Sequence, residues 1–212
     1  MEILERIASA LQQGDDQQVA TLTAEALAGG MAAGEILQRG LVAGMNVVGE
    51  QFKAREIFLP DVLLSARAMY AGLDHLKPHL AREGVSLRGK VVIGSVQGDL
   101  HDIGKNLVGI MLKGAGFEVI DLGHDVAPER FVEAAQREKA PLIGLSALLT
   151  TTMPRMKDVV SLVRERGLGG SVRVIVGGAP VNADFAREIG ADDYACDAAT
   201  AVERVKALMG VS

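Results

Sequence analysis

The chain has 212 residues, 49% of them hydrophobic and 23% charged, and is long enough to bury a sizeable core in one or two domains. Its formal net charge is -5 and its 22 basic residues are scattered, which argues against a nucleic-acid partner because phosphate backbones attract clustered positive charge. No apolar run approaches the roughly 20 residues of a membrane span, and the first residues lack the layout of a signal peptide. We therefore expect a cytoplasmic protein with no membrane partner. Its one cysteine, Cys196, excludes an internal disulfide and any multi-thiolate metal site within one chain.

Residues 1–88 predict a bundle of about four helices. Apolar residues recur there at steps of three and four, as they do on the buried face of a helix. Asp15 or Asp16 is placed to cap a helix that runs through Val19 and Leu22. The other apolar faces comprise Ile3, Ile7, Ala10 and Leu11; Leu37, Leu41, Met45, Val48 and Phe52; and Val62, Ala66, Met69, Leu73, Leu76 and Leu80.

Two prolines lie within the last of these helical patterns. Pro60 suits its first turn, whereas Pro78 predicts that the helix ends or kinks near Lys77, because proline has no N–H to donate inside a helix. His75 and His79 have the i, i+4 spacing of a helical metal pair. Because Pro78 lies between them and no third ligand is evident, we interpret them as solvated residues at a helix end.

The second part of the chain has the pattern of an α/β domain. Val and Ile together number 10 in residues 1–88 but 24 in residues 89–212, a shift toward strand-forming residues. Residues 84–89, with a glycine at each end, mark the expected boundary between these two domains. Five apolar runs alternate with helical stretches, which predicts a Rossmann-like parallel sheet with helices on both faces and the flavodoxin-like strand order. The expected strands are 91–96, 117–122, 142–148, 172–176 and 193–195.

Residues capable of chemistry follow three of the expected strands. The loop after the first contains Asp99, His101 and Asp102, while residues 146–152 follow the third and residues 177–178 the fourth. A histidine and two aspartates in one loop can bind a metal, and Asp99 can accept a hydrogen bond from the ring nitrogen not used for ligation. Taken singly, such residues are more often caps and tight turns. Their convergence on the sheet edge where these folds bind ligands favours a functional site.

The residues Asp99-x-His101-x-x-Gly104, Ser146-x-Leu148 and Gly177-Gly178 resemble the signature of cobalamin-binding domains. Residues 98–106, together with 48–52, 58–60 and 65–67, are similar to the paired cap and cobalamin domains of methionine synthase. They resemble still more closely the small free-standing corrinoid proteins of methanogens and acetogens. The resemblance covers the chain from about Gly40 to Ala207.

The resemblance implies a cobalt site built on His101. This histidine would be the lower axial ligand of cobalt, and Asp99 would hydrogen-bond its other ring nitrogen and carry or release a proton. Thr152 stands where methionine synthase extends this relay with a serine, and it keeps the hydroxyl. Phe52 and Leu59 match cap residues that shield a cobalt-bound methyl group. The implied corrinoid-binding set also contains Gly98, Leu100, Asp102 and Ile103, and a slot for the nucleotide tail lined by Gly104, Ser146, Leu148, Thr150, Gly177 and Gly178, with Ala198 near its far end and Cys196 packed close by.

A methyl carrier is the function that the resemblance implies. The corrinoid supplies the difficult chemistry, so the chain would provide a lower ligand, its hydrogen-bond partners and a removable lid, without being catalytic alone. The implied partners are a substrate:corrinoid methyltransferase, a second methyltransferase that delivers the methyl group to tetrahydrofolate or coenzyme M, and a reductive activase. The sequence does not distinguish a methanol, methylamine, betaine or aryl methyl ether donor, because the partner enzyme selects the donor.

Several alternatives use parts of the same pattern. A cobalamin-dependent sensor or regulator would have the same two domains, but no DNA-binding domain fits before residue 40. A cobalamin isomerase subunit is disfavoured by the helical cap. An all-helical phosphohydrolase of the HD type is disfavoured because His101-Asp102 follows a clear strand pattern. An FMN or receiver domain would explain the fold but not the pairing of His101 with Asp99.

Overall fold

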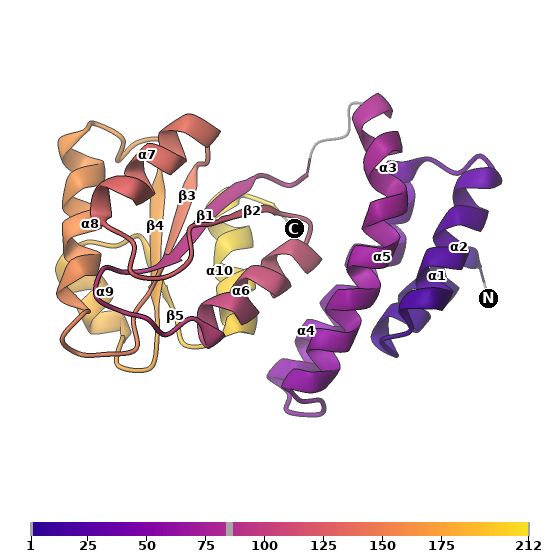
Figure 1. Ribbon diagram of the computed structural model, residues 1–212, viewed down its shortest axis with the longest axis horizontal. Coiled ribbons are helices and arrows are strands. Elements are labelled where there is room, and N and C mark those ends of the chain that lie inside the picture. The colour runs from indigo at the N-terminus through magenta and orange to yellow at the C-terminus, as the bar shows by residue number, and fades with distance from the viewer. Residues whose placement is uncertain (1, 84–86, 212) are drawn as a thin grey trace. The chain divides into compact units, whose positions relative to one another are not determined.

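The computed structural model describes residues 2–83 and 87–211, so residues 84–86 of the expected boundary segment lie outside the described residues. The chain falls into two compact units. The first consists of Met1–Leu87 with Lys113–Gly116, and the second of Arg88–Leu112 with Phe117–Ser212. Figure 1 shows the first unit as helices alone and the second as a sheet covered by helices.

The helical unit contains α1 (Ile3–Gln12), α2 (Asp16–Ala28), α3 (Ala33–Glu35), the π-helix η1 (Ile36–Val42), α4 (Ala43–Lys53) and α5 (Leu59–Glu83). Because α3, η1 and α4 follow one another directly, the described residues form four helical rods, as the apolar pattern predicts. Asp15 is the N-cap of α2, and its side chain accepts a hydrogen bond of 2.9 Å from the Gln18 amide. Among the described residues, none of the helices combines the length and apolar character of a membrane span.

The π-helix was not expected from the sequence. Its apolar residues are buried like those of an α-helix, so the pattern of burial does not reveal the wider turn. The rod that contains η1 packs closely on α1 at two glycines. A Cβ added at Gly44 would lie 3.0 Å from the backbone of Ala8, and one added at Gly40 would lie 3.2 Å from the side chain of Ile7. Small residues at these positions therefore allow the two helix backbones to approach.

We expected α5 to end or kink near Lys77. The prediction of an end there is wrong, because the helix continues through Pro78 to Glu83. Proline removes one donor, and the acceptor left without it is the carbonyl of Asp74, one turn earlier. Both Pro78 and Asp74 are exposed, so water can satisfy that carbonyl. Burial of the opposite face, with Leu76 and Leu80, stabilises the helix on both sides of the proline.

The second unit is a five-stranded sheet in the order β2-β1-β3-β4-β5, in which every pair of neighbours is parallel. This confirms the flavodoxin-like order expected from the strand and helix alternation. The strands are β1 (Lys90–Ser95), β2 (Glu118–Asp121), β3 (Leu142–Ser146), β4 (Arg173–Gly177) and β5 (Asp193–Ala195). The helices are α6 (Ile103–Gly114), α7 (Pro128–Glu138), α8 (Pro154–Glu165), α9 (Ala183–Ile189) and α10 (Ala198–Met209).

Helices cover both faces of this sheet. Successive residues of a strand point to opposite faces. A Cβ added at Gly94 of β1 would touch Phe131 of α7, whereas the neighbouring Ile93 lies against Gly109 of α6. Figure 1 correspondingly shows α7 and α8 on one side of the strands and α6 and α10 on the other. The loops that follow the carboxyl ends of the strands are thus left free to form a site.

Candidate functional site

The loop between β1 and α6 is held in place by backbone hydrogen bonds. Gly98 has a φ of +84°, a conformation that favours glycine, and its amide donates to Oδ1 of Asp125 at 2.7 Å. The Asp125 amide in turn donates to the carbonyl of Asp99 at 3.0 Å, and the Asp99 amide donates to Val96 at 3.0 Å. Asp99 is therefore anchored to the end of β1 and to the loop that follows β2.

Asp99 is fully buried, and its carboxylate accepts five hydrogen bonds. Oδ2 accepts from the amides of Leu148 and Leu149 at 2.8 and 3.2 Å and from the Thr152 hydroxyl at 2.7 Å. Oδ1 accepts from the backbone amide of His101 at 3.1 Å and lies 2.8 Å from its ring Nδ1. The structure thus brings together Asp99, His101 and Thr152, which the resemblance placed in one relay.

These hydrogen bonds decide the charge of Asp99. Burial alone raises the pKa of its carboxyl, but donation from the Thr152 hydroxyl, the Leu148 amide and His101 outweighs burial and holds the pKa well below its usual range. The group is therefore a carboxylate at neutral pH and can only accept. Consequently Nδ1 of His101 must carry the proton, and Nε2 of the neutral ring keeps its lone pair for a metal or a donor.

The imidazole of His101 stands at a partly apolar surface. Its side chain is 51% exposed, although its carboxylate partner is fully buried. Monomeric proteins rarely expose several large apolar side chains together unless the surface binds something. Four large apolar side chains are exposed here: Leu100 in the loop after β1, Ile103 at the start of α6, and Leu148 and Leu149 in the loop after β3.

The glycines of the expected tail slot fall into two groups. Gly104, in the first turn of α6, is exposed, and a Cβ added there would meet no atom within 4 Å. Gly177 and Gly178 are enclosed by backbone instead. A Cβ at Gly177 would lie 2.9 Å from the carbonyl oxygen of Ala195, and one at Gly178, whose φ is +135°, only 1.9 Å from that of Ala147. The fold itself therefore requires Gly178, whereas it does not require Gly104.

The other expected tail-slot residues lie at the same sheet edge with different exposures. Ser146, the last residue of β3, pairs with Gly177 of β4. Thr150 is exposed, while Ala198 is buried as the first residue of α10. Asp102 is half-buried just before α6. The expectation that Cys196 is packed is wrong, because it is exposed in the turn before α10, where the chain leaves the sheet.

The two residues expected to shield the ligand belong to the helical unit. Phe52 lies near the end of α4 and Leu59 begins α5, and both are half-buried. Phe58, between the two helices, is the most exposed of the large apolar side chains that the structure describes in this unit. The turn between α4 and α5 therefore offers apolar surface to a partner or ligand.

Two buried polar residues were missed as candidates in the sequence. Ser95 ends β1, and its hydroxyl donates to the carbonyl of His101 at 2.6 Å. Lys105, in the first turn of α6, donates to both carboxylate oxygens of Asp121 at 2.7 and 2.6 Å and to Asn106 at 2.7 Å. The signals available in the sequence are a serine at the end of a mostly apolar strand and a lysine at the start of a helix. Neither signal identifies the hydrogen-bond partner of the side chain.

Comparison with known proteins decides the family. Two models described as B12 binding domains match residues 89–206 and 3–77. The chain is 45% identical over 213 residues to a corrinoid protein of Desulfitobacterium hafniense strain Y51, covering 99% of each chain. The chain belongs to the B12-binding corrinoid proteins.

Further relatives connect this corrinoid protein with methyltransferase systems. It is 43% identical over 210 residues to trimethylamine corrinoid protein 1 of Methanosarcina mazei, covering 98% of this chain and 97% of that one. Among solved structures, the methanol:cobalamin methyltransferase complex of Methanosarcina barkeri matches with a TM-score of 0.88 and 33% identity, over 99% of this chain and 80% of that chain. The predicted family, fold class and corrinoid cofactor are confirmed. The roles of individual residues in this corrinoid protein remain predictions.

The site residues fit a corrinoid. Imidazole nitrogen is a suitable ligand for first-row transition metals, and a carboxylate on the other ring nitrogen is the usual way in which a ligating histidine is oriented. In this corrinoid protein His101 offers the free nitrogen, Asp99 orients the ring, and the exposed leucine and isoleucine side chains provide apolar surface for a large ring. The open space at Gly104 leaves room for a close approach to the backbone.

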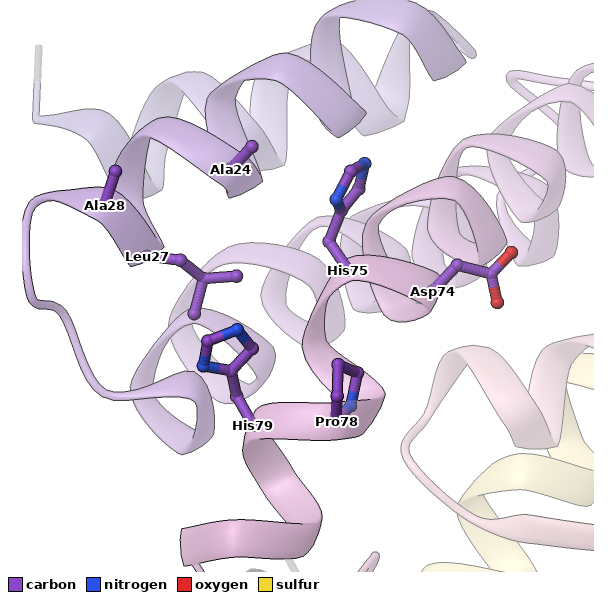
Figure 2. Close-up of a pocket in the computed structure, with 7 residues that line it drawn as sticks. All are labelled: Ala24, Leu27, Ala28, Asp74, His75, Pro78 and His79. Atoms are coloured by element: carbon purple, nitrogen blue, oxygen red, sulfur yellow. The ribbon is translucent and has the colours of Figure 1, made fainter.

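A separate pocket lies in the helical unit, between α2 and α5. Figure 2 shows the imidazoles of His75 and His79 on the side of α5 that faces α2. Because α5 continues through Pro78 to Glu83, the two histidines lie before the helix end where we expected them; His75 is exposed, as expected, whereas His79 is half-buried. The carboxylate of Asp74 is paired with Lys77 at 2.6 Å, and no cluster of three metal-binding side chains occurs among the described residues. The remaining lining residues are Ala24, Leu27 and Ala28.

Proposed function

We propose that this corrinoid protein carries a methyl group on the cobalt of its corrinoid between two methyltransferases, and that His101 is the residue that would hold the cobalt. The observation that carries the proposal is the exposed His101 ring, whose Nδ1 is held at 2.8 Å by the fully buried carboxylate of Asp99. When bound, the corrinoid supplies a cobalt centre that accepts a methyl cation equivalent from a donor and gives it up to an acceptor nucleophile.

The chain's own residues orient the ligand and manage its proton. Asp99 fixes the ring tautomer and, as a carboxylate, increases the basicity of Nε2 of His101. Thr152 has one hydroxyl proton but two acceptors within reach, Asp99 at 2.7 Å and the carbonyl of Leu149 at 2.9 Å. If Asp99 takes up a proton, the hydroxyl can turn to Leu149 and accept from the protonated carboxyl. Thr152 thereby supports both protonation states of the His101 and Asp99 pair.

The remaining expected residues complete this proposal. The corrinoid would be contacted by Gly98, Leu100 and Asp102, in the loop that carries His101, and by Ile103 and Gly104, at the start of α6. Phe52 and Leu59 of the helical unit would shield the transferred methyl group from water, consistent with their incomplete burial. The slot for the nucleotide tail would be formed by Ser146, Leu148, Thr150, Gly177 and Gly178, with Ala198 toward its end.

The partners follow from the carrier role. A substrate:corrinoid methyltransferase would load the methyl group, a second methyltransferase would pass it to tetrahydrofolate or coenzyme M, and a reductive activase would restore the reduced cofactor in the cytoplasm. The relatives are named for trimethylamine, dimethylamine and methanol systems, so a donor with its methyl group on nitrogen or oxygen is the class to test first. These names support a methyl carrier over a sensor that binds the corrinoid without transfer.

Spectroscopy on the reconstituted protein tests the ligand assignment. We expect the cobalt(II) form to show nitrogen superhyperfine splitting in its electron paramagnetic resonance spectrum. His101→Ala should abolish the splitting and weaken cobalamin binding, whereas the control His75→Ala, in the helical unit, should change neither. The assignment would be overturned by a wild-type spectrum without nitrogen splitting. It would also be overturned by a His101→Ala spectrum that keeps the splitting of the wild type.

Methyl exchange tests the carrier role itself. The reduced protein would be incubated with purified methyltransferases of trimethylamine, dimethylamine and methanol systems, each with its own donor, and the absorption change on methylation recorded. We expect methylation with at least one of these enzymes, followed by transfer to coenzyme M or tetrahydrofolate when the second enzyme is added. Failure with every pair, in a protein that has retained its corrinoid, would favour the sensor alternative.

A further inference from the structure

Ser95 is a buried residue with a hydroxyl, at the end of a strand that is apolar from Val91 to Gly94. It is fully buried, and the five residues before it in β1 are Lys90, Val91, Val92, Ile93 and Gly94. A buried hydroxyl without a partner costs free energy, so its presence calls for an acceptor. The acceptor is the carbonyl oxygen of His101, at 2.6 Å.

The donor itself is rigidly held. The Ser95 amide donates to the carbonyl of Gly123 at 3.0 Å, and its carbonyl accepts from the amide of Val126, also at 3.0 Å. Its neighbour on the other side is Ser146 of β3. Ser95 is therefore fixed between two segments of the fold, and its hydroxyl acts as a stationary anchor for the residue that it binds.

His101 has little packing of its own, since about half of its side chain is exposed. Three hydrogen bonds hold it. Asp99 accepts from the ring at 2.8 Å and from the backbone amide at 3.1 Å, and Ser95 donates to the backbone carbonyl at 2.6 Å. The two Asp99 contacts lie on the amide and ring side of the residue, whereas the Ser95 contact holds its carbonyl side.

We propose that Ser95 is a positioning residue that fixes the backbone of His101, so that the ring is already placed for cobalt. Asp99 then sets the tautomer and basicity of the imidazole, while Ser95 sets its place relative to the sheet. The proposal rests on the assignment of His101 as the residue that would hold the cobalt. A ligand on a fixed backbone competes better than a free one, because less conformational freedom is lost on binding.

Competition with free imidazole measures this placement directly. The protein is loaded with cob(II)alamin under anaerobic conditions and titrated with nitrogen-15 imidazole, which turns the triplet splitting of a nitrogen-14 ligand into a doublet. Losing one hydrogen bond should let imidazole replace His101 in Ser95→Ala at a concentration between about twofold and tenfold lower than in the wild type. The control Ser65→Ala removes an equally buried hydroxyl, which has no hydrogen-bond partner, from the helical unit and should leave that concentration unchanged.

The outcomes separate this proposal from the assignment on which it rests. A wild-type spectrum without a nitrogen triplet would overturn the assignment of His101, whatever Ser95 does. A wild-type triplet with the same imidazole concentration in Ser95→Ala would overturn only the role of Ser95. If Ser95→Ala does not fold, Ser95→Cys replaces it, because cysteine has a similar size and retains a weak donor. The imidazole concentration that replaces His101 in Ser95→Cys should lie between that of the wild type and that expected for Ser95→Ala. An unchanged concentration in folded Ser95→Cys would then count against the proposal.

Discussion

The hydroxyl of Thr152 donates to Oδ2 of Asp99 across 2.7 Å, although the two residues are 53 positions apart in the chain. Both side chains are buried, and Thr152 enters the site from the turn that precedes α8. The contact therefore links the loop after β1 to the loop after β3. Together with the amides of Leu148 and Leu149 it keeps a buried carboxylate ionised beside His101.

Replacing Thr152 by valine should destabilise the protein in a pH-dependent manner. Valine has nearly the same shape but no hydroxyl, so at pH 7 the free energy of unfolding should fall by about 1.5–3 kcal/mol, the usual range for a hydrogen bond to a charged group. Folding lowers the pKa of Asp99 from its ordinary value of 3.8, so the stabilisation is present above pH 3.8 and is lost as the pH falls through the folded-state value. The unfolded state is the same for both proteins. Their difference should therefore stay constant below pH 3.8 and narrow only as the pH falls through the folded-state pKa of Asp99 in Thr152→Val, which lies below 3.8 but above that of the wild type.

Urea unfolding followed by circular dichroism at several pH values measures this difference. Thr152→Ser keeps the hydroxyl and is the matched control, which should remain closer to the wild type at pH 7. A Thr152→Val deficit that stays constant even at pH values where folded Thr152→Val has protonated Asp99 would show that lost packing, and not the hydrogen bond to the carboxylate, explains the effect.

The Lys105 and Asp121 ion pair should respond unequally to removal of its two members. The Lys105 side chain is 3% exposed and that of Asp121 36%, so Asp121→Ala leaves a buried ammonium group without its carboxylate. This should lower the free energy of unfolding by about 3–5 kcal/mol. Lys105→Met should cost less, because the carboxylate that remains is partly solvated and still accepts from the Gly123 amide at 2.9 Å.

Urea denaturation at neutral pH measures both variants. Asp158→Ala is a suitable reference, since it breaks an exposed 3.0 Å pair with Arg155 and should change the free energy of unfolding by no more than about 1 kcal/mol. An equal loss in Asp121→Ala and Lys105→Met, or the reverse order, would contradict the assignment of the burial cost to the lysine.

Substitutions of Gly178 and Gly104, both expected to line the tail slot, should affect folding and ligand binding differently. In Gly178→Ala the new methyl group would lie 1.9 Å from the carbonyl oxygen of Ala147, so we expect a loss of more than about 4 kcal/mol or no folded protein. Gly104→Ala meets no atom within 4 Å and lies in α6, so the protein without corrinoid should be unchanged or stabilised by up to about 1 kcal/mol.

Cobalamin binding distinguishes the role of Gly104 from that of Gly178. If the corrinoid approaches the backbone of α6 closely, Gly104→Ala should weaken binding in an absorption titration despite its intact fold. The matched control is Gly170→Ala, because Gly170 also has open space around its Cβ position, has no positive φ and lies in the loop before β4. Gly30 has similar space, but its φ of +82° makes it unsuitable. Gly170→Ala should bind cobalamin normally. Equal affinity in Gly104→Ala and Gly170→Ala would remove Gly104 from the binding set.

Much of the architecture can be predicted from the sequence, because it depends on local patterns. The observed strands differ from the expected ones by at most two residues at either end, and the parallel order follows from regular alternation with helices. The pairing of Asp99 with His101 is also local, since two residues in one loop are already close. The family was identifiable because its motif lies within such continuous segments.

Only the tertiary structure shows which distant residues hydrogen-bond to the residues of this motif. Position along the chain does not reveal that Thr152 and the Leu148 amide meet the carboxylate of Asp99, nor that Ser95 donates to His101. Strand β3 ends at Ser146, two residues earlier than expected, and the Leu148 amide is thereby available to Asp99.

The two wrong predictions at Pro78 and Cys196 also show that local sequence patterns do not determine tertiary packing. Local propensity predicted a helix end near the first, but packing of the buried face carried α5 through it. A small apolar character suggested burial for the second, but the turn before α10 placed it in solvent. The sequence by itself determined the order of elements and the ligand-bearing motif, because these arise from residues close in the chain. Which groups stabilise that motif was decided by long-range packing, whose free energy depends on residues brought together only by the fold.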